Sequence, residues 1–433
     1  MQKIWNLGSG ARLVVEEIPY VKSVALGVFI GVGSRHEPHN LSGASHFIEH
    51  MLFKGTENRS ARDIADLFEG MGGQLNAYTS RENTCVYART LDEDLYRAMD
   101  TIFDMVFRSG LAERDFETEK GVVVEEINMY EDTPDDLIHD IFAQQLWLGH
   151  GLGQPTLGTL ETVGGFSRDD LYDYYRYSYV PANMVIAVAG NVKADQVREE
   201  VERHLAWSSA AKPEFELIAP QPAEAFLHLL PKETEQVQIC MGVPGISYHD
   251  PRRFAQNIMN SILGGGISSR LFQAIREEMG LAYSIYSYPS NFADNGSYVI
   301  YVGTSPGKLE PFFKVLKREL DQFIDRGISE EELVRTQKLI KSSLYLGMES
   351  VMNRMNRLGK SVLMYNQVTP LEEIIEKIMA VKTSTIQELA RELISPQRFS
   401  LAAIGSPDVL EKVEKYYRQS WTQAEKPTGR RKL

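Results

Sequence analysis

The feature that most constrains the fold of this chain is a weak internal repeat. The stretch "VKSVALGVFIGVGSRHEP" (21–38) is matched by "VQICMGVPGISYHDP" (237–251), and "GLAERDFETEKGVVVEEI" from Gly110 is matched by "GISEEELVRTQKLIKSSL" from Gly327. Near the end of each half, "VPANMVIAVAGNV" parallels "SPQRFSLAAIGSP". The interval of about 215 residues is far longer than a solenoid repeat, so the pattern predicts two copies of one domain. Chance similarity between the halves is the alternative.

The two copies are expected to be joined by a linker. The stretch "SSAAKPEFELIAPQPAEA" is rich in Ala and Pro and has no helical period. It predicts a linker at 209–225 between an N-terminal domain, 1–208, and a related C-terminal domain, 226–433. Within each copy, alternating strand-like stretches are followed by long helical ones, such as 60–71, 92–109 and 114–130. We therefore expect an α+β fold in which each domain is a mainly antiparallel sheet with helices packed on one face.

Composition excludes several classes of protein. The formal net charge of −13 disfavours a nucleic-acid partner, whose phosphates would repel the chain. The longest near-apolar run, "VALGVFIGVG", is too short to span a bilayer, and the N-terminus lacks the pattern of a signal peptide. Cys85 and Cys240 lie far apart and form no CxxC pair. We therefore expect a cytoplasmic protein without a membrane partner.

The pentapeptide "HFIEH" lies in a predicted helix, "LSGASHFIEHMLFKGT", with Ser42 as a possible N-cap and Gly55 as a stop. At about 100° per residue, one face of this helix is apolar and His46, Glu49 and His50 lie roughly opposite. The apolar face consists of Ala44, Phe47, Ile48, Met51 and Leu52. The polar trio is therefore expected to point away from the core, towards a cleft or solvent.

The spacing of these three residues suits metal chemistry. Histidines at i and i+4 lie one above the other on a helix, so His46 and His50 can bind one Zn²⁺. Glu49 projects beside them and can take a proton from water activated by the metal. HxxEH is the inverzincin motif. A solvated polar helix face is the alternative, and a third ligand is needed to decide.

A candidate for the third ligand comes from "ERDFETEKGVVVEEINMYEDTP". The predicted apolar face of this helix consists of Phe116, Val122, Val123, Ile127 and Tyr130, and the solvated side of Glu117, Gly121, Glu125 and Asn128. Glu119 and Glu126 fall in the middle of the apolar face. Because an unpaired buried carboxylate is costly, this placement indicates Glu126 as the third zinc ligand, unlike the adjacent Glu125. Structural salt bridges of Glu119 and Glu126 to Arg or Lys are the alternative.

The motifs "SGASHFIEHMLFKGT" and "EKGVVVEE" resemble the pitrilysin–insulinase metallopeptidases, in particular the half-length branch that includes the mitochondrial processing peptidase. The resemblance covers nearly the whole chain. It implies that His46, His50 and Glu126 bind zinc, that Glu49 is the base, and that Glu119 supports catalysis. Because Ser343 stands at the position that corresponds to Glu126 in the second copy, we expect one zinc ion per chain.

The resemblance also implies residues that bind substrate. Asn76 and Ala77 match an edge strand to which an extended peptide adds, although an ordinary edge strand would look alike. Arg276 and Tyr283 match an Arg and Tyr pair that contacts substrate from the second half in longer family members. A half-length chain would then supply this pair through a homodimer, or through a heterodimer with a related chain. Arg276 as a plain surface residue is the alternative.

We therefore expect a zinc-dependent endopeptidase that cleaves peptides or short unfolded segments inside a closed chamber. One alternative is a non-catalytic partner or peptide-binding subunit of a processing peptidase complex. A zinc-loaded peptide-binding protein with negligible turnover is another.

Overall fold

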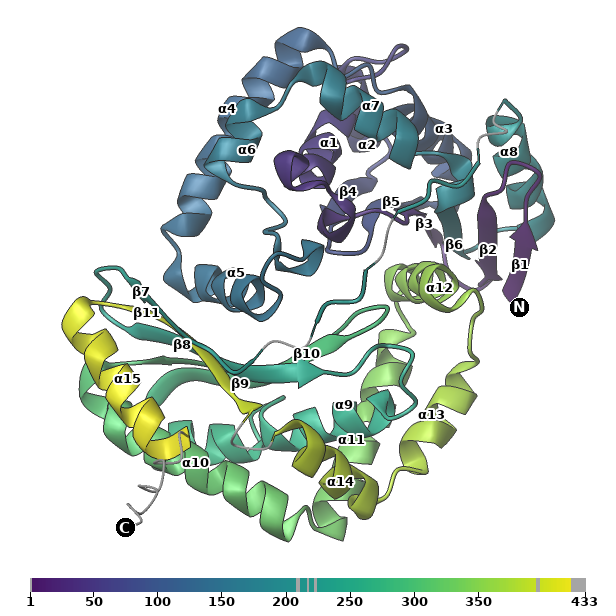
Figure 1. Ribbon diagram of the computed structural model, residues 1–433. Coiled ribbons are helices and arrows are strands. Elements are labelled where there is room, and N and C mark those ends of the chain that lie inside the picture. Colours follow the sequence, from purple (N-terminus) through teal and green to yellow (C-terminus); the bar gives the residue numbers. More distant parts are fainter. Residues whose placement is uncertain (1, 208–210, 216–217, 222–223, 395–397, 422–433) are drawn as a thin grey trace, which may run out of the picture. The chain divides into compact units, whose positions relative to one another are not determined.

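The computed structural model describes residues 2–207, 211–215, 218–221, 224–394 and 398–421 (Figure 1). The chain forms two compact units. The first comprises Met1–Met129, Gly149–Ile218 and Ser342–Leu371, and the second Tyr130–Leu148, Ala219–Lys341 and Glu372–Leu433. Parts of the predicted linker, 209–210, 216–217 and 222–223, lie outside the described residues.

The first unit contains a six-stranded sheet in the order β1-β2-β6-β3-β5-β4. Its strands are β1 (Gln2–Asn6), β2 (Arg12–Glu17), β3 (Ser23–Ile30), β4 (Gln74–Thr79), β5 (Thr84–Leu91) and β6 (Met184–Gly190). Neighbouring strands are antiparallel except for the parallel pair β2 and β6.

The second unit contains a five-stranded sheet in the order β7-β11-β8-β10-β9. Its strands are β7 (Leu227–Pro231), β8 (Val237–Gly245), β9 (Ala282–Asn291), β10 (Gly296–Thr304) and β11 (Ser400–Gly405). Its parallel pair is β7 and β11, at the position that β2 and β6 hold in the first sheet. Without β1, the two sheets have the same strand order, in agreement with the internal repeat. The expected α+β class is confirmed.

Groups of helices follow groups of strands along the chain. Those of the first half are α1 (Ala44–Leu52), α2 (Ala61–Gly70), α3 (Leu95–Arg108), α4 (Glu113–Glu131), α5 (Pro134–Leu146), α6 (Leu160–Gly165), α7 (Arg168–Ser178) and α8 (Ala194–Leu205). Those of the second half are α9 (Arg253–Leu263), α10 (Leu309–Arg326), α11 (Glu330–Gly347), α12 (Val351–Tyr365), α13 (Leu371–Met379), α14 (Thr383–Leu393) and α15 (Pro407–Trp421). A π-helical segment, η6 (Phe272–Glu278), precedes β9. The expected helices 60–71, 92–109 and 114–130 correspond to α2, α3 and α4.

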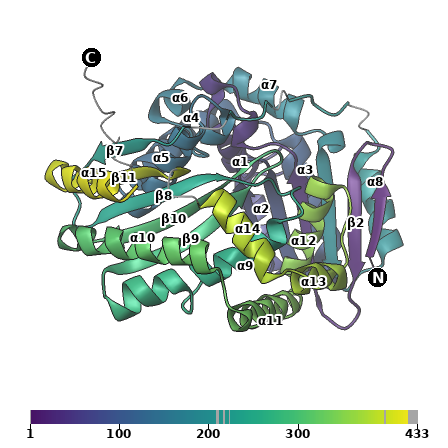
Figure 2. The same ribbon diagram turned by 60° about the horizontal axis from the view of Figure 1, so that its bottom comes forward.

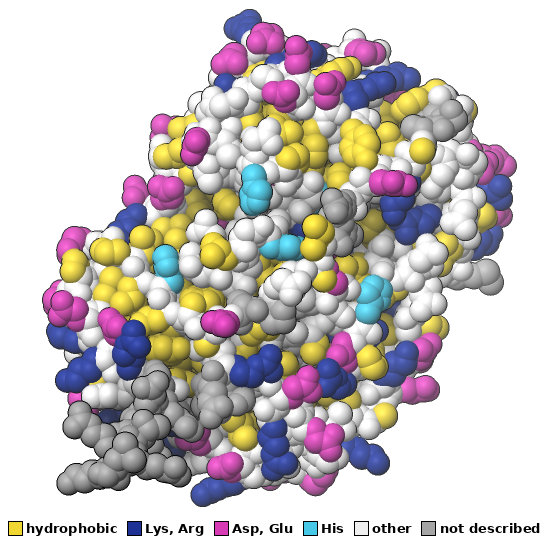
Figure 3. All heavy atoms as spheres, in the orientation of Figure 1, with side chains coloured by type: hydrophobic (Ala, Val, Ile, Leu, Met, Phe, Trp, Pro, Cys, Tyr) yellow, Lys and Arg dark blue, Asp and Glu magenta, His cyan; other side chains and the backbone are white. Residues whose placement is uncertain are grey.

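None of the described helices is long and apolar enough to cross a membrane. On the face drawn in Figure 3, acidic and basic side chains are interspersed.

Each half of the chain contributes one helix to the compact unit of the other. Helix α5 belongs to the second unit and helix α12 to the first, so the units differ in these segments from the expected continuous domains 1–208 and 226–433. Helix α12 packs on the first sheet beside β6, β3 and β2 (Figures 1 and 2). Its buried stripe consists of Val351, Met355, Leu358 and Val362. This sheet therefore has helices on both faces, whereas the sequence led us to expect them on one.

The contact between α12 and β3 is very close. A Cβ atom built on Gly359 of α12 would lie 2.0 Å from Cε2 of Phe29, and Phe29 is fully buried. A buried aromatic ring has no flexible end that could move aside. The helix can approach the sheet this closely only because position 359 has no side chain.

We expect Gly359→Ala to lower the free energy of unfolding by about 1–3 kcal/mol, because the added methyl group overpacks the core. The measurement is the midpoint of urea unfolding of the purified chain.

Gly121 of α4 is the matched control. It has no atom within 4 Å of an added Cβ, so Gly121→Ala is expected to raise stability by up to about 1 kcal/mol through helix propensity. Equal stabilisation by both substitutions would contradict the close contact of α12 with β3.

Candidate metal centre

Helix α1 buries the apolar face that its sequence predicts, but His46, expected on the opposite polar face, is only 8% exposed. Its apolar face is buried in the first unit and consists of Ala44, Phe47, Ile48, Met51 and Leu52. The expectation that Ser42 is the N-cap is wrong. The cap is Gly43, with φ of 96°, and the Ser42 hydroxyl has no hydrogen-bond partner among the described residues. The chain turns into the helix through a left-handed residue, which glycine adopts without strain.

Helix α4 carries both glutamates that its helical phase singled out. Phe116 is fully buried, and Glu119 is 2% exposed. The expectation that Val122 belongs to the apolar face is wrong, since Val122 is 46% exposed. Val122 lies at the border of the helix face, where the helical wheel does not separate buried from exposed positions. The rings of Phe47 and Phe116, with centroids 5.0 Å apart, join α1 to α4.

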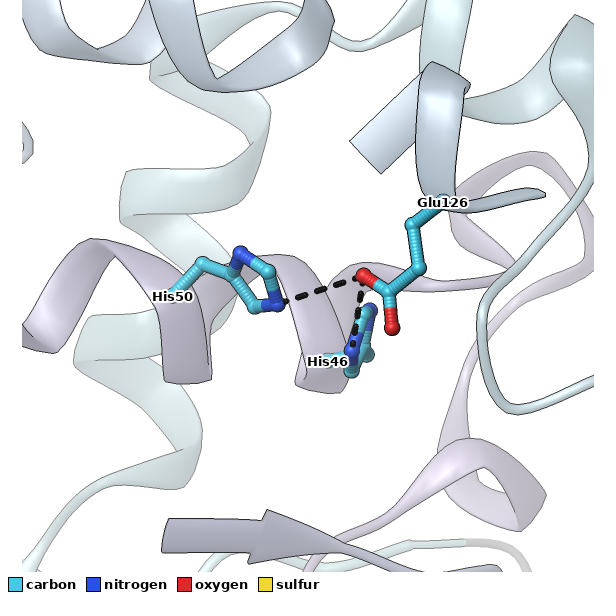
Figure 4. Close-up of side chains that lie close together, drawn as sticks. All are labelled: His46, His50 and Glu126. Atoms are coloured by element: carbon cyan, nitrogen blue, oxygen red, sulfur yellow. Dashed lines mark ion pairs between the residues drawn. The ribbon is translucent and has the colours of Figure 1, made fainter. Parts of the chain in front are cut away.

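The packing of these two helices brings His46, His50 and Glu126 together (Figure 4). Oε2 of Glu126 lies 3.8 Å from Nε2 of His46 and 3.5 Å from Nε2 of His50. In Figure 4 the carboxylate points towards both imidazole rings from the neighbouring helix. Ligand atoms on a tetrahedral zinc ion lie about 3.3 Å apart, so small side-chain adjustments would bring these three onto one ion. The donor set, two imidazoles and a carboxylate, fits zinc and leaves a position open.

The protonation state of His46 also suits a metal ligand. Burial, assisted by the nearby His50, lowers the pKa of His46 to about 3. The imidazole therefore stays neutral at physiological pH, and a neutral ring nitrogen is the form that coordinates a metal.

The orientation of His50 is set by a second pair of charges. Nδ1 of His50 lies 2.8 Å from Oε1 of Glu119, and Nζ of Lys54 lies 2.6 Å from Oε2 of the same carboxylate. A carboxylate can only accept, so Nδ1 carries the proton and Nε2 is left free to face Glu126. Glu119 thus forms a structural salt bridge to a lysine, the alternative that its sequence position left open. Lys54 was not recognised in the sequence, although it follows His50 by one helical turn.

Glu49 is held beside this cluster by the sheet. The Thr79 hydroxyl of β4 donates a hydrogen bond of 2.6 Å to Oε2 of Glu49. Burial raises the pKa of Glu49, while the hydrogen bond from Thr79 and the charge of His50 oppose this rise. The charge of Glu126 also raises it, so the two carboxylates are close enough to interact. A carboxylate with a raised pKa is suited to exchange protons near neutral pH. Thr79 was not recognised from the sequence either.

Asn76 and Ala77 lie on β4, the edge strand next to the cluster. Strand β4 is hydrogen-bonded to β5 and is the last strand in its sheet. The amide of Ala77 donates to Oδ1 of Asn76 at 2.8 Å. The Ser80 amide, three residues further on, donates to the Asn83 carbonyl across the hairpin, and successive strand amides point to opposite sides. The Ala77 amide therefore faces the open edge of the sheet, where a further strand would pair.

Arg276 and Tyr283 belong to the second unit, on η6 and β9. The Arg276 guanidinium lies 4.8 Å from the ring centroid of Phe272 and 5.0 Å from that of Tyr283. Tyr283 is 76% exposed. The two residues are thus neighbours, and their contact with substrate stays a prediction.

Comparison with known proteins reveals close relatives. An uncharacterized zinc protease of Bacillus subtilis is 41% identical over 407 residues, which cover 94% of this chain and 98% of that protein. An uncharacterized zinc protease of Streptomyces coelicolor is 40% identical over 407 residues, covering 92% of this chain and 88% of that protein.

Solved structures share the fold. A peptidase M16 inactive domain from Pseudomonas fluorescens superposes with a TM-score of 0.88 at 18% identity, covering 94% of this chain and 98% of that one. A protease from Helicobacter pylori superposes with a TM-score of 0.84 at 20% identity, covering 94% and 99%.

Family comparison covers most of the chain. Residues 12–160 match the family described as insulinase (peptidase family M16), and residues 165–340 match the peptidase M16 inactive domain. Together with relatives at about 40% identity along nearly their whole length, these matches show that the chain belongs to the insulinase family, peptidase family M16.

Proposed function

We propose that the chain is a zinc-dependent endopeptidase. The observation that carries this proposal is the convergence of His46, His50 and Glu126 beside the Glu49 carboxylate. The names of the relatives, which are zinc proteases, support the same activity. In this proposal one zinc ion per chain is held by His46, His50 and Glu126.

Glu49 acts as the general base. A bound zinc ion supplies Lewis acidity, which acidifies water and polarises a peptide carbonyl. Glu49 accepts the proton of the attacking water at its carboxylate and then delivers it to the leaving amide nitrogen. The Thr79 hydroxyl holds one carboxylate oxygen, so the other is free to accept the proton.

Glu119, which is paired with Lys54, supports the reaction indirectly through its hydrogen bond with His50. It keeps the proton of His50 on Nδ1 and thereby keeps Nε2 available as a ligand. Outer partners of this kind usually change metal affinity by about 10–100-fold.

The substrate is proposed to bind as an added strand at the edge of β4. An extended peptide could accept a hydrogen bond from the Ala77 amide once the Asn76 side chain moves aside. Main-chain pairing of this kind accepts many sequences, which suits an enzyme for peptides or short unfolded segments. Because Thr79 of the same strand holds Glu49, a peptide on this edge would lie close to the base.

A second chain is proposed to close the chamber and to supply Arg276 and Tyr283. The contacts of the Arg276 guanidinium with the rings of Phe272 and Tyr283 restrict its position, and it would donate to the oxyanion that forms on the substrate.

Mixing inactive chains tests whether this pair acts in trans. Glu49→Gln chains mixed with Arg276→Ala chains are expected to recover about a quarter of wild-type peptidase activity, since half of the dimers are mixed and each has one intact site. No recovery, with exchange of subunits verified by native mass spectrometry, would contradict action in trans.

Three conservative glutamate substitutions separate the proposed roles. Glu126→Gln is expected to lose zinc, because an amide is a weak ligand. Glu49→Gln is expected to retain one zinc ion but to lower kcat for an unstructured fluorogenic peptide by about 10²–10⁴-fold. Glu125→Gln is the control, and it should change neither quantity because Glu125 is exposed. Zinc content is measured by elemental analysis after dialysis.

Two outcomes would contradict these roles. Equal zinc loss in Glu125→Gln and Glu126→Gln would rule out Glu126 as the specific ligand. Full peptidase activity of Glu49→Gln would rule out Glu49 as the base, and a zinc-loaded wild-type chain without turnover would favour a peptide-binding protein.

The pH dependence of kcat/KM should report on Thr79. Glu49 must be ionised to act as a base, so activity falls as the pH falls through its raised pKa. The hydrogen bond from Thr79 lowers this pKa. We therefore expect Thr79→Val to move the acid limb of the profile to higher pH.

Thr90→Val is the matched control on the neighbouring strand. The buried Thr90 hydroxyl donates to the carbonyl oxygen of Leu91 and is expected to leave the profile unchanged. An unchanged or acid-shifted limb in Thr79→Val would show that Thr79 does not stabilise the ionised base.

A further inference from the structure

The N-terminus of α1 is capped by a carboxylate from outside the helix. Oε2 of Glu37 accepts a hydrogen bond of 2.7 Å from the amide of Gly43, and Oε1 accepts one of 2.6 Å from the amide of Ser45. Gly43 is the N-cap residue and Ser45 the second residue of α1, and the N-cap residue itself provides no side-chain cap. Both oxygens of one carboxylate are therefore engaged with the start of the helix that carries His46, Glu49 and His50.

Glu37 is itself firmly held. It is 5% exposed, and its backbone carbonyl accepts a hydrogen bond of 3.0 Å from Nε2 of Gln154. The helix start is also fixed, because a Cβ atom on Gly43 would lie 2.7 Å from the carbonyl oxygen of Leu157. The bridge from Glu37 to α1 thus joins two closely packed segments, and neither can shift freely.

The Glu37 carboxylate is buried, unlike a carboxylate that caps a helix at the protein surface. Burial raises its pKa to about 7, while the hydrogen bonds from Ser45 and Gly43 oppose the rise. Tyr174 and Tyr179 lie nearby, since the charge of Glu37 raises both of their pKa values in addition to burial. Placing a carboxylate in such an environment is costly, and its amide partners at the positive end of the helix dipole offset the cost.

Helix α1 needs such support because it is short. With nine residues it is below the length at which an isolated helix is stable in water. Its C-terminal half is tied to α4 through His50, Glu119 and Lys54. Glu37 holds the other end of the helix through the amide of Ser45, the residue directly before His46.

We propose that Glu37 is a positioning residue of the metal centre, which sets the axial position and rotation of α1 by binding its first amides with both carboxylate oxygens. The proposal rests on the proposed zinc peptidase function and adds a residue to it. Glu37 does not touch the metal or the substrate. Its effect reaches them through the backbone of α1, by holding His46, Glu49 and His50 in register with Glu126.

The experiment compares two carboxylates that cap helices in the same unit. Glu17 accepts a hydrogen bond of 2.7 Å from the amide of Ala194 and so caps α8, which carries no residue of the site. Glu37→Gln and Glu17→Gln each replace a capping carboxylate by an amide of the same shape. Both are expected to lower the thermal unfolding midpoint, so stability alone does not distinguish them.

Zinc binding and catalysis distinguish the two variants. For Glu37→Gln we expect zinc affinity, measured by competition with a chromophoric chelator, to fall by about 10–100-fold, as for other residues that orient ligands. We expect kcat to fall by about tenfold or more with KM within about twofold, because the reacting groups move while the substrate edge stays in place. Glu17→Gln should change zinc affinity and kcat by less than about twofold.

Other outcomes decide against the proposal. Equal zinc affinity and kcat in the two variants would overturn it, and a wild-type chain that binds no zinc would overturn it together with the proposed function. If the wild type binds zinc but cleaves no peptide, only the proposed activity fails, and zinc affinity still tests Glu37.

If Glu37→Gln does not fold, Glu37→Asp is used as the second variant. It keeps the charge, reaches one amide less well, and is expected to bind zinc more weakly than the wild type, so unchanged affinity would overturn the proposal.

Discussion

The candidate site depends on the packing of α1 against α4. The ring of Phe47 in α1 contacts those of Phe116 in α4 and Phe166, with centroids 5.0 and 5.7 Å away. Because this face of α1 is buried, the opposite face presents His46 and His50 towards Glu126. Helices are stiff, so this aromatic contact limits where the polar groups of the two helices can meet. Glu126 lies 3.5 and 3.8 Å from the two imidazoles in this arrangement.

The charges around this contact follow a consistent pattern. A buried carboxylate is costly unless donors or cations surround it. Glu119 has His50 and Lys54, Glu49 has Thr79, and Glu37 has two backbone amides. Glu126, whose side chain is 34% exposed, instead faces Nε2 of His46 and Nε2 of His50, an arrangement that a divalent cation would complete. Of these four carboxylates, Glu126 is therefore the one whose surroundings suit a metal ligand.

Much of the fold and part of the site could be predicted from periodicity. The helical phase of α1 correctly predicted its buried apolar residues but not the burial of His46, and the phase of α4 singled out Glu119 and Glu126. The same argument failed for Val122, at the border of a face, and for Ser42, where a distant carboxylate replaced the local cap. The exchange of α5 and α12 between the units was not visible, because a buried helical stripe does not show which sheet covers it.

From the amino-acid sequence alone we could predict two related domains, the strand and helix pattern, and the residue types that can bind a metal. These follow from local periodicity and from a repeat, which depend only on spacing along the chain. The packing of the folded chain was needed to show that Lys54 pairs with Glu119, that Thr79 holds Glu49, and that Glu37 caps the helix with His46 and His50. Such contacts join residues 6 to 65 positions apart, and the distance between them is decided by the packing of the elements that carry them.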